Sequence, residues 1–126
     1  MTHPHKGTTG LQRIVRACGH SARGLADALR SESAFRQECL LAVVLIPAAF
    51  WVGRRPTEVA LLVGSVLLVL IVELLNSAVE AAIDRISLDL HDLSRRAKDF
   101  GSAAVALSLL LCVLIWAAVL AERFAP

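Results

Sequence analysis

The sequence predicts an all-α membrane protein with three transmembrane helices and one N-terminal amphipathic helix, and two observations lead to this prediction. Of the 126 residues, 56% are hydrophobic and 19% are charged, whereas soluble domains average about 45–50% and about 25%. The apolar residues also come in long uncharged blocks rather than in the spaced pattern of a soluble core. We therefore expect one membrane domain over residues 1–126.

The first expected element is an amphipathic helix over residues 10–30 that lies on the membrane surface. Its apolar residues recur at spacings of one helical turn or two: Leu11, Ile14, Val15, Cys18, Ala22, Leu25 and Leu29. Between them lie the arginines Arg13, Arg16, Arg23 and Arg30. An arginine-rich face suits the headgroup region of an anionic leaflet. The same pattern would also suit a helix that packs on another subunit or on a soluble partner.

The three transmembrane helices are expected at about 34–52, 57–84 and 99–121. The first contains only 14 uncharged residues from Cys39 to Val52, about 21 Å of helix, so we extend it back to Ala34 to span a membrane. Pro56 suits the first position of the second helix. The third contains 20 uncharged residues from 102 to 121. Trp51 and Trp116 lie near the ends of the first and third helices, as interfacial anchors do.

The distribution of basic residues predicts how the chain lies in the membrane. Residues 1–38 contain six Lys or Arg and residues 84–99 contain four, while the opposite side has only Arg54, Arg55 and Arg123. Because basic residues favour the cytoplasmic side, we expect the N-terminus and the 84–99 segment in the cytoplasm and the C-terminus outside.

An acidic stripe interrupts the second expected transmembrane helix. Glu73, Asn76, Glu80 and Asp84 fall within about 80° of helix surface when each residue advances by 100°. A carboxylate that faces lipid costs several kcal/mol, so such residues usually face a bundle interior or a polar cavity and mark a functional site. An asparagine in this position also serves in many proteins as a plain hydrogen-bonding contact between helices. The two glutamates on one face are harder to explain without a function.

Composition narrows the chemistry without deciding it. The net charge of +2 is too small to imply a nucleic-acid partner, and neither GxxxxGK[ST] nor GxGxxG occurs. The expected cytoplasmic rim mixes carboxylates with arginine, lysine and histidine, and such a mixture can hold Mg²⁺ together with a polyphosphate. On these grounds alone, phosphoryl transfer and ion or proton transport are both possible functions.

Four segments carry a resemblance to a known family. They are RIVRACGHSARGL (13–25), SAFRQE (33–38), ELLNSAVEAAIDRI (73–86) and AKDFGSAAV (97–105). Together they resemble the small bacterial integral-membrane diacylglycerol kinases, collinearly from about Thr9 to Trp116. The resemblance implies a homotrimer in the inner (cytoplasmic) membrane of a bacterium. It also implies transfer of the γ-phosphoryl group of ATP to diacylglycerol, which forms phosphatidic acid, with Mg²⁺ as cofactor.

The resemblance also implies roles for individual residues. Glu73 matches the catalytic base, and Glu32 and Glu80 match the two carboxylates that hold the metal on the nucleotide. The implied ATP-binding residues are Arg13, His20, Glu32, Glu80, Asp89, His91, Lys98 and Asp99. The implied lipid-binding residues are Arg13, Ala34, Phe35, Arg36, Gln37, Glu38, Trp51, Glu73, Ser102 and Trp116. Asn76 and Asp84 match supporting positions.

Four positions depart from the pattern of the family. His20 stands where many members have Tyr, Ala22 where they have Trp, Ala26 where they have a basic residue, and Arg95 where Gly is frequent. An undecaprenol kinase of the same family type remains an alternative. A small oligomeric transporter that uses Glu73 as a proton or cation carrier is an alternative from another class. Such a carrier needs one buried acid, whereas a kinase also needs the metal carboxylates, Lys98 and the basic surface helix.

Overall fold

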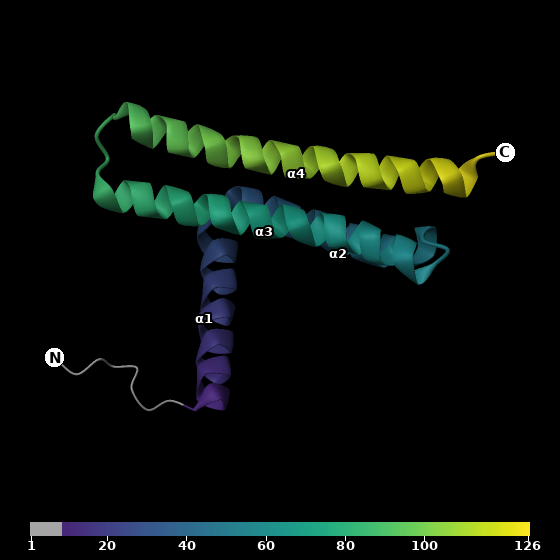
Figure 1. The fold of residues 1–126 in the computed structure, drawn as a ribbon, viewed down its shortest axis with the longest axis horizontal. Coiled ribbons are helices and arrows are strands. Elements are labelled where there is room, and N and C mark those ends of the chain that lie inside the picture. Colours follow the sequence, from purple (N-terminus) through teal and green to yellow (C-terminus); the bar gives the residue numbers. More distant parts are fainter. Residues whose placement is uncertain (1–8) are drawn as a thin grey trace.

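The computed structural model describes residues 9–126, and over this range the chain forms four helices and no strand (Figure 1). The helices are α1 (Gly10–Ser31), α2 (Ser33–Val52), α3 (Pro56–Ile86) and α4 (Asp92–Phe124). The last three are each long and apolar enough to cross a membrane. The predicted class, three transmembrane helices and an N-terminal helix, is confirmed. The part of the expected domain before Thr9 lies outside the described residues.

The three long helices lie side by side, and α3 is the central one (Figure 1). It packs against both α2, which passes behind it in Figure 1, and α4, while α2 and α4 touch only slightly. Helix α1 stands roughly perpendicular to this layer, and its N-terminal end points away from it (Figure 1). We call the end of the layer with the α3–α4 loop the loop end. The end with the α2–α3 turn and the C-terminus is the turn end.

Helix α1 begins and ends at clear local signals. Thr9 caps it, because its hydroxyl accepts a hydrogen bond from the Gln12 N–H while the Gln12 side chain accepts one from the Thr9 N–H. Glu32 is extended, with φ −107° and ψ 106°, and separates α1 from α2. The Arg36 guanidinium donates to the carbonyls of Leu29 and Arg30 at 3.1 and 2.9 Å, which fixes this corner. Glu32 makes no side-chain cap hydrogen bond to α2, so its carboxylate stays available.

Helices α3 and α4 are longer than a membrane is thick. Helix α3 has 31 residues, about 46 Å at the helical rise, against about 30 Å of hydrocarbon. Helix α4 begins at Asp92, well before the expected start at residue 99, because the His91 ring accepts a hydrogen bond from the Leu93 N–H and caps it. Both helices therefore reach beyond the apolar stretch, and their polar turns meet at the loop end.

The apolar core lies toward the turn end. Ala49, Val52, Leu62 and Val119 are buried there, with Trp116 among the half-buried residues that pack against them. Farther along the same helices, the buried Ser65 hydroxyl donates to the Leu62 carbonyl at 2.8 Å and lies 3.5 Å from the sulfur of Cys112. Small side chains let α3 approach its neighbours closely. This cluster joins α2, α3 and α4 at the turn end.

Gly53 is required by the tight α2–α3 turn. A Cβ at this position would lie 2.6 Å from the Val59 Cγ2 atom and 3.0 Å from both the Val59 nitrogen and the Ala49 carbonyl oxygen. We expect Gly53→Ala to lower the free energy of unfolding by about 1–3 kcal/mol, the usual cost of overpacking. Unfolding in detergent micelles measures this, with Gly19→Ala as the control because a Cβ there meets nothing within 4 Å. An unchanged midpoint for Gly53→Ala would show that the turn relaxes without cost.

Candidate active site

The centre of the site is the buried Glu73 carboxyl group on α3. Glu73 is only 5% exposed, and none of residues 9–126 forms an ion pair with it. The Glu38 carboxyl group, on α2, lies beside it. Asn76 follows one helical turn later on the same face of α3. We call Glu38, Glu73 and Asn76 the buried acid site.

Two polar atoms of the buried acid site have no hydrogen-bond partner. They are Oε2 of Glu38 and Oδ1 of Asn76, two of the three such buried side-chain atoms among the described residues. Nearly all buried polar atoms in proteins are paired, so an unpaired one calls for an explanation, and a catalytic role is among the common ones. Two of them beside an unpaired buried carboxyl group indicate a site shaped for a polar ligand.

Asn76 holds its place because Gly101 of α4 leaves room for it. A Cβ added at Gly101 would overlap the Asn76 carboxamide, with the Oδ1 atom as its nearest neighbour. Any side chain at 101 would therefore force the Asn76 carboxamide to shift. The close α3–α4 approach at Gly101 thus allows the present position of this amide, one turn along α3 from Glu73.

Glu32 and Glu80 are the two carboxylates expected to hold the metal, and both lie close enough to Glu73 for their charges to act on it. Glu32 lines a groove of about 640 Å³ between α1 and α3, opposite Ser77, Ala78 and Ala81. No cluster of three or more metal-ligating side chains occurs among residues 9–126. Two carboxylates are nevertheless a sufficient protein contribution for Mg²⁺, which prefers one or two of them together with substrate phosphate oxygens. The donor set of Glu32 and Glu80 therefore fits Mg²⁺ on a nucleotide.

A pocket of about 310 Å³, with mostly polar and charged residues around it, lies where α3, the α3–α4 loop and α4 meet at the loop end. We call it the loop pocket. It is lined by Ile83, Asp84, Ser87, Leu88, Asp89, Leu90, His91, Ser94, Arg95, Lys98 and Asp99. The structure thus brings together four of the expected ATP-binding residues, namely Asp89, His91, Lys98 and Asp99, with Asp84 and Arg95 beside them.

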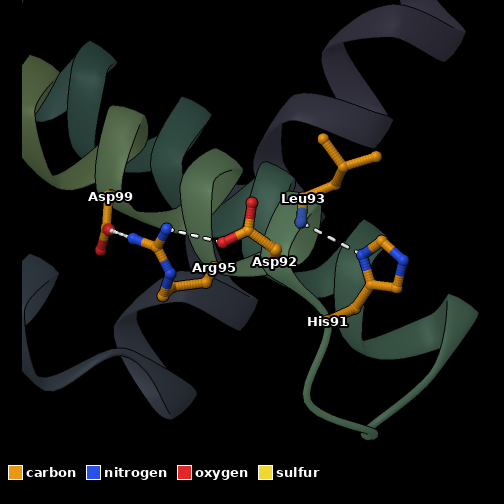
Figure 2. A network of polar contacts seen from close by, with 5 residues as sticks. All are labelled: His91, Asp92, Leu93, Arg95 and Asp99. Carbon is orange, nitrogen blue, oxygen red and sulfur yellow. Dashed lines mark hydrogen bonds and ion pairs between the residues drawn. The ribbon is translucent and has the colours of Figure 1, made fainter.

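Hydrogen bonds order the side chains of the loop pocket (Figure 2). Lys98 donates to the Asp84 carboxylate at 2.8 Å and links α4 to α3. This hydrogen bond and the charge of Asp84 raise the pKa of the Lys98 ammonium group above its ordinary value, so Lys98 stays cationic. The Nδ1 atom of His91 accepts from the Leu93 N–H at 3.1 Å, which puts the ring proton of a neutral His91 on Nε2. The Nε2–H group of His91 is therefore available as a donor to a ligand.

Two expected ATP-binding residues lie elsewhere in this chain. Arg13 and His20 belong to α1 and are exposed, and α1 projects away from the layer that contains the loop pocket (Figure 1). His20 contacts Arg23 on its own helix at 2.7 Å. The structure of one chain therefore does not bring these two residues to Lys98 and Asp99.

Besides Arg13, Glu38 and Glu73, the expected lipid-binding residues fall into three groups. Near the α1–α2 corner, Ala34, Arg36 and Gln37 are exposed, whereas Phe35 is buried at 2% exposure. Ser102 is exposed near the loop end. At the turn end, Trp51 is 69% exposed and packs on Phe124, whereas Trp116 turns inward and its indole N–H is buried without a partner. The two tryptophans thus lie in different surroundings.

Comparison with known proteins places the chain in a family. Residues 19–120 match the family model described as prokaryotic diacylglycerol kinase. The chain belongs to this family. It is 53% identical over 117 residues to a diacylglycerol kinase of Pseudomonas aeruginosa, which covers 93% of this chain and 95% of that protein.

Other relatives carry the same name. The chain is 47% identical over 113 residues to a diacylglycerol kinase of Haemophilus influenzae, covering 90% of this chain and 96% of the relative. It is 45% identical over 117 residues to a diacylglycerol kinase of Escherichia coli strain K12, covering 93% and 96%. These matches confirm the family that the four sequence segments indicated.

Proposed function

We propose that this protein is an ATP-dependent diacylglycerol kinase in which Glu73 is the general base. The observation that carries the proposal is the buried Glu73 carboxyl group, which has no cationic partner among the described residues and lies beside two unpaired polar atoms. Glu73 accepts the proton of the lipid hydroxyl while the hydroxyl oxygen bonds to the γ-phosphorus of ATP. The bond from that phosphorus to the bridging oxygen breaks, and the products are phosphatidic acid and ADP.

The loop pocket is the proposed nucleotide end of the site. Lys98 offsets the charge of the phosphate chain, and the free Nε2–H of His91 is a second donor. Glu32 and Glu80 would hold Mg²⁺, which when bound offsets negative charge on the phosphoryl oxygens. The diacylglycerol would enter from the membrane beside Glu38 and Glu73, since its glycerol hydroxyl has to reach the base while its acyl chains stay in lipid.

A homotrimer is the proposed assembly, and the position of α1 supports it. Arg13 and His20 are far from the loop pocket of their own chain, so they can contribute to a nucleotide site only if α1 reaches a neighbouring subunit. Co-reconstituting an Arg13→Ala chain with a Glu73→Gln chain tests this. Mixed trimers are expected to regain activity, because one intact site can form from the two chains. No recovery would mean that each site is built by one chain.

The proposed location is the inner membrane of a bacterium, with the N-terminus and the loop pocket facing the cytoplasm. The excess of basic residues in the segments 1–38 and 84–99 supports this orientation. It also gives the loop pocket access to cytoplasmic ATP. The test introduces one cysteine at the C-terminus of a chain whose three native cysteines are replaced by serine. A membrane-impermeant thiol reagent is expected to label this cysteine in intact cells, and absence of label before lysis would contradict the orientation.

One assay distinguishes the proposed activity from the two alternatives. Purified protein in mixed micelles is given labelled MgATP and either diacylglycerol or undecaprenol. We expect label in diacylglycerol, because the relatives are named for this lipid. Preferential labelling of undecaprenol would favour the other lipid kinase. Label in neither lipid would contradict the kinase proposal and favour the transporter alternative.

Removing either metal carboxylate is expected to lower the affinity for Mg²⁺, and a higher Mg²⁺ concentration should restore activity. For Glu32→Gln and Glu80→Gln, the Mg²⁺ concentration for half-maximal activity should rise about 10-fold, the scale of one lost charged contact. Titration of Mg²⁺ at fixed ATP measures this. The matched control is Asp27→Asn, because Asp27 lines the same groove as Glu32. An equal shift in the control would show that only the general charge of the groove matters.

A further inference from the structure

Arg95 lies in the loop pocket, although the family resemblance gives it no role. Its guanidinium donates to Oδ1 of Asp92 at 2.7 Å and to Oδ2 of Asp99 at 2.8 Å (Figure 2). The three residues are spaced by three and four positions on α4, so they lie on one face of the helix. Arg95 and Asp99 both line the loop pocket.

The two ion pairs fix the guanidinium but do not use all of its donors. A guanidinium has five N–H groups in one plane, and two of them contact Asp92 and Asp99. The Arg95 side chain is 62% exposed, so the remaining N–H groups are open to a ligand. Exposed pairs of this kind contribute little to stability, about 0–1 kcal/mol. Stability alone therefore gives little reason for this arrangement.

The charges of the loop pocket give a stronger reason. Its lining carries three carboxylates, from Asp84, Asp89 and Asp99, and two permanent cations, from Lys98 and Arg95. Lys98 is already paired with Asp84. Without Arg95, the carboxylate of Asp99 would have no ion-pair partner, and the lining would carry one more uncompensated negative charge toward a polyphosphate.

We propose that Arg95 is a nucleotide-binding residue of this protein, which neutralises Asp99 and offers its remaining N–H groups to the phosphate chain of ATP. A guanidinium suits this task because its planar donors match phosphate oxygens in pairs. The inference rests on the proposed kinase function, since it assigns a ligand to the loop pocket. It involves binding alone and no bond-making step.

The neighbouring Arg96 provides a matched control. It has the same charge and lies on the same helix, but its guanidinium lies over the Phe100 ring, 5.9 Å from the ring centroid, and it does not line the loop pocket. We expect Arg95→Gln to raise the KM for MgATP about 10-fold, with kcat and the KM for diacylglycerol nearly unchanged. This is the pattern of lost ground-state binding. Arg96→Gln is expected to keep all three values close to those of the unaltered protein.

Direct binding of MgATP and thermal unfolding in detergent complete the test. The dissociation constant for MgATP should rise about 10-fold in Arg95→Gln, while the unfolding temperature stays close to that of Arg96→Gln. Arg95→Lys keeps the charge and replaces the Gln variant in the test if that variant does not fold. Its dissociation constant for MgATP should lie between those of Arg96→Gln and Arg95→Gln. Equal nucleotide affinity in the Arg95 and Arg96 variants would overturn the inference. If the unaltered protein did not phosphorylate diacylglycerol, the proposed function would be wrong. The MgATP-binding measurement would still decide whether Arg95 binds the nucleotide.

Discussion

Glu73→Gln is expected to lower the rate of lipid phosphorylation by about 10²–10⁴-fold, the usual contribution of a general base. The amide keeps the size of the side chain and its place between α2 and α3, but it cannot accept the proton of the lipid hydroxyl. The loop pocket does not include Glu73, so binding of MgATP should change little. Steady-state kinetics in mixed micelles and direct nucleotide binding measure the two effects separately.

Glu122→Gln is the control for this prediction. Glu122 is an exposed carboxylate at the turn end, where it forms a 3.7 Å ion pair with Arg54. Its loss should leave kcat within about 2-fold of the original value, because exposed pairs contribute little. If Glu73→Gln reduced nucleotide binding as strongly as turnover, Glu73 would belong to the nucleotide site and its assignment as the base would be wrong.

The acidic stripe shows how far the sequence could predict the site. Helical periodicity placed Glu73, Asn76, Glu80 and Asp84 on one face, and the structure buries Glu73 in the helix contact. Periodicity does not reveal, however, which residues of the stripe are buried between helices and which are exposed. Asp84 lies at the exposed end of α3 and pairs with Lys98 of α4. That contact depends on the path of the α3–α4 loop, which no spacing within one helix encodes.

The two tryptophans show that the sequence does not predict which side of an evenly apolar helix is buried. Trp51 and Trp116 occupy similar positions near the ends of apolar helices, so the sequence predicts an interfacial anchor at each. Helix α4 is apolar on every side over most of its length, and its sequence therefore contains little information about which side faces α3. In the structure, Trp116 packs on the core at the turn end while Trp51 is exposed. Rotation of an evenly apolar helix is decided by packing alone.

The contribution of α1 was equally hard to predict from one chain. The amphipathic pattern gave the helix itself, which the structure has from Gly10 to Ser31. The pattern allowed a membrane surface, another subunit or a soluble partner, because an arginine-rich face with an apolar stripe suits all three. Arg13 and His20 acquire a place in a nucleotide site only through the assembly, and a single sequence describes one subunit.

Gly101→Ala is expected to reduce activity at least about 10-fold and to destabilise the protein by about 1–3 kcal/mol. In an open helix position, Gly→Ala is instead stabilising by about 1 kcal/mol, because alanine has the higher helix propensity. The sign reverses at 101 because the new Cβ would overlap the Asn76 carboxamide. Either α4 moves away from α3 or Asn76 leaves the buried acid site. Unfolding in detergent and the lipid kinase assay measure the two consequences.

A second substitution separates packing from function at this contact. In Gly101→Ala with Asn76→Ala, the carboxamide is gone and the new methyl group has room, so stability should recover. Activity should stay low, since the amide beside Glu73 is missing. Gly64→Ala on α3 is the control, because a Cβ there meets nothing within 4 Å in the chain, and it should not lower stability. Recovery of both stability and activity in the double variant would mean that Asn76 serves only the packing of α3 on α4.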